Sequence, residues 1–545
     1  MGYILAFIVI ILAIYLFVVY VLPVIAAAAG IIAGVIAVIA VAVGGFNAIK
    51  NYVVAIREEM DFKNWYWPNR DEPAKRSYFF GPGYRQLGET ISYAFRLNVR
   101  SGRAITNTAM RWRGDPGVWG MCKTIGVTIY QIVAYICIYG IGTVLCAAVA
   151  LIHGSVTTIF MVIFYIIFSV VWLVDRIYLW RMKIRSDCPN CHSRFLIPHF
   201  ECPECGSIHK KLVPGPYGVW HHTCLCGNKL PSTFFTGRSE LKAICPCCNN
   251  PLVASDARPL VFQLVGGTKA GKTVYISAFF HQFLQKLRRS KDLKVTISEE
   301  YQAHFDSMEE WYRGGDCPAT AQLNSQMYPV LVDGGGVRRQ FSIYDIAGEM
   351  FDGHTADSQI QQQQFHYCDG LIFIMDPLSG GELRRSRLDE TGDISDFSDM
   401  AAEDVVTNFV NYLIRTGHAK ANARCHIPLS VVIAKCDVPE VKRLLSPAKI
   451  RSEFNKCDDP NMTLEGMRDE LCRQFLVDIG LSAAVENLEA QFTNVHYFPV
   501  SAMGHEADGS RYEPWGVYES IEWMLPLADK EFAEKIVEDS QQMRI

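Results

Sequence analysis

The chain has 545 residues, half of them hydrophobic, and a formal net charge of −4. This length leaves room for several domains, and the slightly acidic balance argues against a general affinity for nucleic acid. Of its eighteen cysteines, eight form short-spaced pairs shortly before a nucleotide-binding pattern, which indicates a reducing compartment and metal rather than disulfides.

The first segment, 1–48, is strongly apolar. Residues 3–47 carry no charge, a run about twice the ~20 residues that span a bilayer. A single helix of this length would exceed the hydrocarbon core, so we predict two transmembrane helices, 3–22 and 24–46, with a turn at Pro23. A cleaved signal peptide is the alternative, but the N-terminus has no basic residue and the apolar run continues past any cleavage point.

A second apolar segment covers 124–180. His153-Gly154-Ser155 interrupts it and predicts two further helices, 125–152 and 156–178. Arginine and lysine are frequent in 49–123 and again just after the last helix, so both flanks are predicted to be cytoplasmic. Four spans then place the N-terminus and the C-terminal region on the cytoplasmic side of what we take to be a bacterial inner membrane. The scarcity of charge within the spans favours an anchor over a transporter.

The basic segment 49–123 is also rich in aromatic residues. Arginine and aromatic side chains next to a bilayer suit a segment that lies along anionic headgroups. A small folded loop that packs on the following module explains the same composition, and both interpretations stay open.

Four cysteine pairs lie within 184–255. Their spacings are typical of turns that bring two thiolates to one zinc ion. The simplest grouping follows chain order, with two Zn²⁺ bound in two four-cysteine ribbons, and it leaves His221, His222 and Cys247 as alternative ligands. We expect a rigid spacer or docking module rather than a reader of nucleic acid, because basic residues are few. The pairs are Cys188 and Cys191, Cys202 and Cys205, Cys224 and Cys226, and Cys245 and Cys248.

The last segment, 256–545, begins with an apolar run that leads into a glycine-rich turn and then a helical pattern. This is the G-x-x-x-x-G-K-[ST] spacing in its strand–loop–helix context. Backbone N–H groups of such a turn surround a β-phosphate, the lysine reaches the β- and γ-phosphates, and the hydroxyl binds Mg²⁺. Lys272 and Thr273 take these two roles here. The turn comprises Gly266, Gly267, Thr268, Lys269, Ala270, Gly271, Lys272 and Thr273.

Three later strand ends carry polar residues that suit a nucleotide. Asp345 ends a strand and would hold the Mg²⁺ hydration shell, with the amide of Gly348 on the γ-phosphate. Asp437 follows another strand, and its two acceptor oxygens match the adjacent N1 and N2 donors of guanine. A backbone amide of Ser501-Ala502 would meet the guanine O6. Strands that alternate with helices predict a parallel-rich sheet covered on both faces.

Taken in order, these motifs resemble those of Ras-like P-loop GTPases of the TRAFAC class. The matching residues are 266–273, 345–348, 434–437 and 501–502, and Thr320 is the candidate switch threonine and Mg²⁺ ligand. The whole layout resembles bacterial double-GTPase-type proteins of GTPase-centred conflict systems. The resemblance implies a Ras-like α/β domain that binds GTP or GDP, with Lys435, Asp437, Ser501 and Ala502 at the nucleotide, an unidentified effector or activator protein, and a nucleotide-dependent homodimer as one arrangement.

Two departures from the pattern define the alternatives. Ala434 replaces the usual Asn or Thr, which weakens guanine selectivity, and Glu349 stands where a water-orienting Gln is usual, which slows hydrolysis or makes it depend on a partner. The first hypothesis is a membrane-anchored GTPase that acts as a switch, with Lys272, Thr320, Gly348 and Glu349 as its catalytic residues. The alternative is a zinc-ribbon membrane adaptor that binds nucleotide but hydrolyses it weakly.

Overall fold

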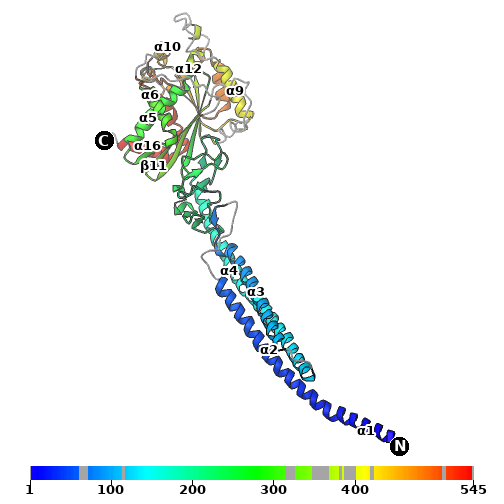
Figure 1. The fold of residues 1–545 in the computed structure, drawn as a ribbon. Helices are drawn as coiled ribbons and strands as arrows, with labels where there is room; N and C mark the ends of the chain where they lie inside the picture. Colours follow the sequence, from blue (N-terminus) through cyan, green and yellow to red (C-terminus); the bar gives the residue numbers. More distant parts are fainter. Residues whose placement is uncertain are drawn as a thin grey trace. The chain divides into compact units, whose positions relative to one another are not determined.

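The computed structural model describes residues 2–59, 72–112, 117–313, 326–346, 367–379, 383–385, 401–415, 417, 423–505 and 511–542. The chain forms two compact units (Figure 1). The first comprises Met1–Val174 and Leu212–Thr236, and the second comprises Asp175–Lys211 and Gly237–Ile545.

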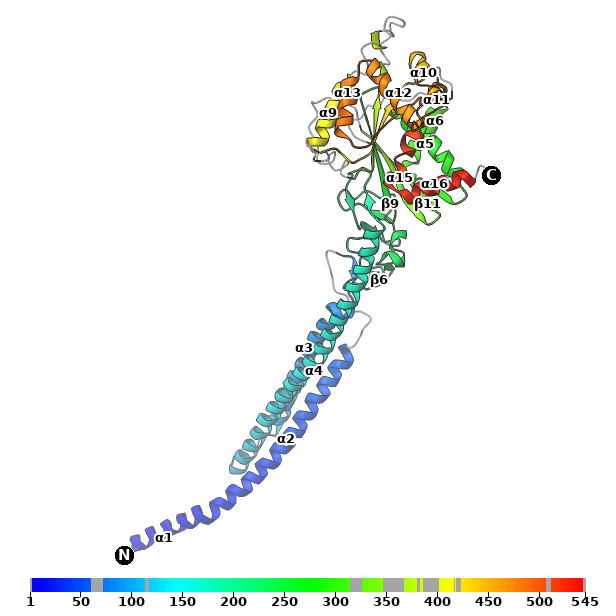
Figure 2. The same cartoon turned by 180° about the vertical axis from the view of Figure 1, so that it is seen from behind.

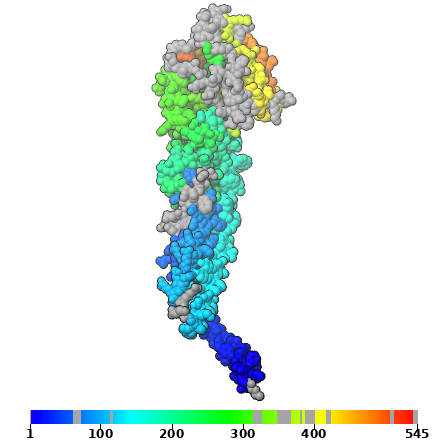
Figure 3. Space-filling view, turned by 45° about the vertical axis from the view of Figure 1, so that its right-hand side comes forward, coloured from blue at the N-terminus to red at the C-terminus, as the bar shows by residue number. Residues whose placement is uncertain are grey.

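The first unit opens with one long helix, and the turn predicted at Pro23 is wrong. Helix α1 (Gly2–Leu16), the π-helical turn η1 (Phe17–Val21) and α2 (Leu22–Glu59) follow one another without a break. Proline removes one backbone donor and crowds the preceding turn, and the wider π turn just before Pro23 accommodates it without reversing the chain. Residues 2–32 are exposed, and Figure 3 shows this dark-blue end standing clear of the other helices.

The second apolar segment is also one helix, α4 (Val118–Arg181), so the break predicted at His153 is wrong. The His153 Nε2 atom lies 3.2 Å from the carbonyl oxygen of Gly83 and 3.4 Å from the Tyr78 hydroxyl. The polar ring therefore has hydrogen-bonding partners within the continuous helix. A glycine within a helix costs only about 1 kcal/mol, which packing outweighs. The structure therefore does not support four spans. The prediction that the N-terminus and the C-terminal region lie on the same side of the membrane depended on that number and loses its support too.

Two helices, Gly2–Glu59 and Val118–Arg181, are long and apolar enough to cross a membrane. The segment between them contains α3 (Pro82–Arg111), which packs on α2 through small and polar residues. Asn51 donates to the Asn98 side-chain oxygen at 3.0 Å. On α2, a Cβ at Gly44 would lie 2.7 Å from that of Cys137 on α4, so only glycine permits this approach. Figures 1 and 2 show α3 and α4 side by side.

The short strand β1 (Ala74–Lys75) supports the folded-loop interpretation of 49–123. It pairs antiparallel with β6 (His221–Cys224), which pairs in turn with β7 (Lys229–Pro231), and all three strands belong to the first unit. Part of the basic segment therefore forms a sheet with cysteine-rich residues, and another part is a helix with arginines on its exposed side.

The second unit contains a seven-stranded sheet in the order β10-β11-β12-β9-β13-β14-β15. Neighbouring strands from β12 to β15 are all parallel, whereas β10 and β11 run antiparallel to their neighbours. The carboxyl ends of five strands therefore lie at one edge. The strands are β10 (Leu293–Thr296), β11 (Gln326–Gly334), β12 (Val337–Asp345), β9 (Arg258–Gly266), β13 (Gly370–Met375), β14 (Leu429–Ile433) and β15 (Val495–Pro499).

Helices cover both faces of this sheet, so the expectation of an α/β fold with a parallel-containing sheet is confirmed. One core lies beneath α9 (Ala402–Arg415), α12 (Leu464–Asp478) and α13 (Ser482–Gln491). The other lies beneath α5 (Lys272–Arg289), α6 (Glu299–Tyr312) and α16 (Lys530–Gln542). Figures 1 and 2 show α9 on the opposite side of the sheet from α5 and α6. The central strands are almost wholly buried, as expected for strands covered on both faces.

Two small sheets precede this domain in the second unit. Strands β2 (Ser186–Asp187) and β3 (Arg194–Phe195) form a hairpin. Strand β4 (His199–Glu201) lies between β5 (Ile208–His209) and β8 (Ala243–Ile244).

Candidate nucleotide and zinc sites

The turn between β9 and α5 has the backbone that a phosphate-binding loop requires. Gly271 and Lys269 have φ values of 90° and 57°, and α5 begins directly afterwards at Lys272. A Cβ on Gly266 would lie 2.7 Å from the carbonyl oxygen of Ile374, so β13 passes too close for a side chain. A tight turn at the start of a helix presents its N–H groups to an anion.

Lys272 folds back over this turn. Its Nζ donates to the carbonyl oxygens of Gly266 at 2.9 Å and Gly267 at 2.8 Å, and the residue is 8% exposed. Carbonyl oxygens are weak partners for a buried ammonium group compared with phosphate, whose charge makes the hydrogen bonds stronger. The arrangement suits exchange of these carbonyls for phosphate oxygens.

Asp345 lies at the end of β12, beside the central strand β9 that leads into the turn. It is 3% exposed, and neither carboxylate oxygen has a hydrogen-bond partner among the described residues. Burial raises the pKa of Asp345 to about 6, although the positive charge of Lys272 opposes this rise. A buried carboxylate without donors is costly unless a cation neutralises it. The Asp345 carboxylate therefore suits a divalent cation such as Mg²⁺.

The raised pKa of Asp345 predicts that Asp345→Asn stabilises the nucleotide-free protein at pH 8. The unfolded carboxyl ionises near 3.8 and the folded one near 6, so the folded state loses stability relative to the unfolded state as pH rises between these values. The gain from Asn is at most about 3 kcal/mol above pH 6 and disappears near pH 4. Urea unfolding at both pH values without Mg²⁺ measures it. The exposed Asp292→Asn is the control, and a gain that does not change with pH would contradict the prediction.

The residues predicted to contact the base also come together. Ser501 Oγ donates to Asp437 Oδ1 at 2.8 Å, and the Gly504 N–H donates to Ser501 Oγ at 2.8 Å. These bonds join the segments that follow the parallel strands β14 and β15 and leave the second oxygen of Asp437 for a donor. Ala502, next to Ser501, is half-buried and packs against the core beneath α5.

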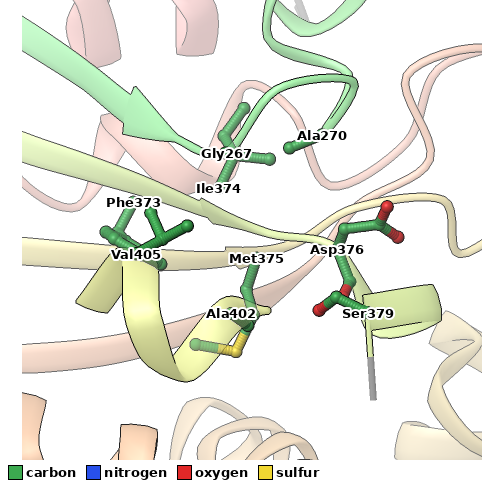
Figure 4. A pocket seen from close by; sticks show the side chains of 9 residues that line it. All are labelled: Gly267, Ala270, Phe373, Ile374, Met375, Asp376, Ser379, Ala402 and Val405. Atoms are coloured by element: carbon green, nitrogen blue, oxygen red, sulfur yellow. The ribbon is translucent and has the colours of Figure 1, made fainter. Parts of the chain in front are cut away.

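Lys435 has a partner that the sequence did not reveal. Its Nζ donates to Asp376 Oδ2 at 2.8 Å, and the other oxygen of Asp376 accepts the N–H of Leu378 at 3.0 Å. Lys435 has φ +54°, a strained value for a lysine, and the buried Asp376 holds it there. Figure 4 shows Asp376 at a small pocket that is also lined by Gly267 and Ala270. The only sequence signal for this role of Asp376 as the partner of Lys435 was its position directly after an apolar strand.

Three predicted site residues lie outside the described residues: Thr320, Gly348 and Glu349. Their roles remain predictions from the sequence.

The grouping of zinc ligands in chain order is wrong. The sulfur atoms of Cys188, Cys191, Cys245 and Cys248 all lie within 4.8 Å of one another, so the first pair joins the last. The Sγ atoms of Cys188 and Cys248 are 3.5 Å apart, as are those of Cys191 and Cys245. Strand β8 leads directly into Cys245 and pairs with β4, which returns the chain to the start of the module. Sequence spacing predicts a pair of thiols but not the partner pair.

Both halves of this group have the same backbone turn. The N–H of His192 donates to the Cys188 carbonyl at 2.9 Å, and the N–H of Asn249 donates to the Cys245 carbonyl at 3.1 Å. His192 and Asn249 each follow the second cysteine of their pair and have φ values of 55° and 60°. Burial raises the pKa of Cys188 and takes that of Cys245 to about 11, a cost that a divalent cation reverses by stabilising thiolates. The four residues therefore fit zinc.

Two of the three alternative ligands, Cys247 and His222, have other contacts. The Cys247 N–H donates to Cys245 Sγ at 3.3 Å, and the His222 Nε2 atom lies 2.8 Å from the Val213 carbonyl oxygen. Cys247 is exposed, whereas Cys248 lies within the group.

Metal counting on two four-serine variants tests the pairing. Replacing Cys188, Cys191, Cys245 and Cys248 by Ser should remove one zinc per chain and leave one, because all ligands of a single ion are lost. Replacing Cys188, Cys191, Cys202 and Cys205 should also remove the ion held by Cys245 and Cys248, because that ion then keeps only two thiolates. If the first variant loses both ions and the second loses only one, the ligands are grouped in chain order.

Comparison with known proteins adds little to this geometry. No family model matches the sequence, and no curated protein matches it. A solved structure described as Sup35 complexed with GMPPNP aligns with 46% of this chain and 38% of that chain, at 14% identity and a TM-score of 0.20. The chain therefore spans well under half of the length of that structure. The described chain is a mixed α/β protein with two apolar helices and cysteine groups that could bind zinc.

Proposed function

We propose that this protein is a membrane-anchored GTPase, a Mg²⁺-dependent switch of the Ras-like P-loop class. The observation that carries the proposal is the position of its site residues. Asp345 is the last residue of a parallel strand, and the glycine turn, Asp437 and Ser501 come at or just after the ends of three others, so all lie at the same edge of one sheet. The chain runs from the central strand β9 to β12 on one side and then to β13 on the other, and ligands of α/β sheets bind where the strand order reverses in this way.

In this mechanism the amides of the turn and Lys272 bind the β- and γ-phosphates. Thr273 and Asp345 would hold Mg²⁺, and the bound ion would supply positive charge that offsets the negative charge developing on the phosphates. Asp437 accepts both guanine donors, with Ser501 fixing its orientation. Loss of the γ-phosphate would release Thr320 and Gly348, which makes the domain a switch.

The proposal includes two zinc ions and a cytoplasmic nucleotide domain. The first ion takes the four thiols described above, and the remaining cysteines, Cys202, Cys205, Cys224 and Cys226, are left for the second. Thiolate ligands and GTP both belong to a reducing cytoplasm. The two apolar helices anchor the chain. Glu349 stands where a Gln usually orients the attacking water, so an activating protein would supply the group that assists hydrolysis.

Nucleotide binding to the full-length protein in detergent tests the proposal. GTP should bind more tightly than ATP, and phosphate release should require Mg²⁺. Equal affinity for the two nucleotides, or no binding of either, would overturn it.

The alternative is a zinc-ribbon membrane adaptor with a weakly catalytic domain. Ala434 favours this alternative, because its methyl side chain cannot make the hydrogen bond that Asn or Thr would make at this position. The backbone N–H of Ala434 donates to the carbonyl oxygen of Met375 at 3.0 Å. A single-turnover assay separates the two: GTP that stays bound and unhydrolysed with Mg²⁺ present supports the adaptor.

A further inference from the structure

The first zinc-binding turn makes an aromatic contact with the nucleotide domain. His192 directly follows Cys191, and its ring lies against that of Tyr344, with 5.0 Å between the centroids and an angle of 70° between the planes. His192 is 6% exposed and Tyr344 is 3% exposed, so the contact is fully buried. Both residues belong to the second unit. An edge-to-face pair of this kind fixes orientation as well as position.

The hairpin that carries this turn is seated on the sheet by a second contact. Arg194 donates to both oxygens of Asp187 at 2.5 and 2.6 Å, which locks β2 to β3. The Arg194 guanidinium lies 4.4 Å from the centroid of the Tyr367 ring, shortly before β13. Strand β2 lies against β9, the central strand. The hairpin of β2 and β3 therefore packs on β9 and on the segment just before β13.

Tyr344 immediately precedes Asp345 in β12. Side chains alternate along a strand, so Tyr344 and Asp345 point to opposite faces of the sheet. Tyr344 packs with Val261 and Met327, whereas Ile343, on the same face as Asp345, belongs to the core beneath α5. Strand β12 is held on both sides here, with Tyr344 opposite Met327 and Gln263. The packing of the Tyr344 ring therefore adds to the contacts that fix the backbone carrying the Asp345 carboxylate.

We propose that the zinc site of Cys188, Cys191, Cys245 and Cys248 sets the position of Asp345 through the contact between His192 and Tyr344. The inference rests on the proposed binding of GTP and Mg²⁺ and makes the zinc module a control element of that site. His192 and Tyr344 are positioning residues, because they act on the metal ligand and touch neither nucleotide nor Mg²⁺.

The end of α4 is joined by an ion pair to the segment that leads to the zinc ligand Cys245. Arg238 donates to Asp175 Oδ2 at 3.0 Å, and the two side chains are 5% and 1% exposed. Asp175 lies in the last turns of α4, and Arg238 lies shortly before β8, the strand that leads to Cys245. A buried ion pair transmits displacement because breaking it leaves an unpaired charge. A displacement of the last turns of α4, from Asp175 onward, would thus reach Asp345 by way of the zinc-binding turn.

Two glycine variants test the inference. His192 and Asn249 occupy the same position in the two turns that hold the same zinc, both with left-handed backbone, which glycine adopts without strain. His192→Gly removes the ring from Tyr344, whereas Asn249→Gly removes an exposed side chain. Measured on the full-length protein, His192→Gly should reduce the gain in GTP affinity on adding Mg²⁺ by about threefold to tenfold, the range that an aromatic contact supports. Asn249→Gly should leave that gain unchanged, and zinc content should stay at the wild-type value in both.

Tyr344→Leu probes the contact from the other side. If both residues act through one contact, the double variant His192→Gly with Tyr344→Leu should be no worse than Tyr344→Leu alone. Equal losses with Mg²⁺ and with EDTA, or equal losses in His192→Gly and Asn249→Gly, would overturn the inference while leaving GTP binding intact. Failure of the wild-type protein to bind GTP would instead overturn the proposed function.

Discussion

Lys272→Ala should abolish measurable GTP binding, with a loss of affinity of about 100-fold or more. The ammonium group is buried and makes two hydrogen bonds within the turn, which phosphate oxygens would replace. Each hydrogen bond to a charged group contributes about 1.5–3 kcal/mol, so the loss of two exceeds a factor of 100. Calorimetry with GTP on the full-length protein measures the effect.

Two further variants separate this result from misfolding. Lys294→Ala removes an exposed lysine from β10 of the same sheet and should leave affinity unchanged. Thr273→Ala should weaken GTP binding with Mg²⁺ but not with EDTA, because its hydroxyl acts on the metal. The loss in Lys272→Ala should persist in EDTA. If Lys272→Ala binds GTP normally, the turn does not hold a triphosphate.

The strands of the nucleotide domain could be predicted from the sequence because the information is local. A strand covered on both faces is a short apolar run, as in β13 and β14, and the phosphate-binding turn has fixed spacing before a helix. The polar residues at the strand ends then share an edge, because parallel strands end on the same side. Asp437 and Ser501, 64 residues apart, meet for this reason.

The errors occur where a local sequence pattern is compatible with more than one arrangement. An apolar run does not distinguish a hairpin of two helices from one long helix, and the π turn before Pro23 and the contacts of His153 decided in favour of continuity. The cysteine spacing defines a turn, but the pairing of β4 with β8 decides which turns share an ion. The ion pair of Asp376 and Lys435 joins residues 59 positions apart and leaves no periodic pattern.

Asp437→Asn should reverse the choice of base. A carboxylate accepts from both N1 and N2 of guanine, whereas an amide offers one acceptor and one donor, and the donor would face the guanine amino group. Xanthine has a carbonyl oxygen at that position, so the variant should bind XTP. The lost charged hydrogen bond and the new repulsion predict a fall in GTP affinity of about 100-fold, with a rise in XTP affinity of similar size.

The ratio of the two affinities is the decisive quantity, because misfolding lowers both. Ser501→Ala is the matched control: it removes the hydroxyl that orients Asp437 Oδ1 but leaves the carboxylate, so GTP and XTP affinities should keep their wild-type ratio while GTP binding weakens by about tenfold. If Asp437→Asn lowers GTP binding without any gain for XTP, Asp437 stabilises the loop after β14 and does not read the base. Guanine selectivity would then have to come from another part of the site.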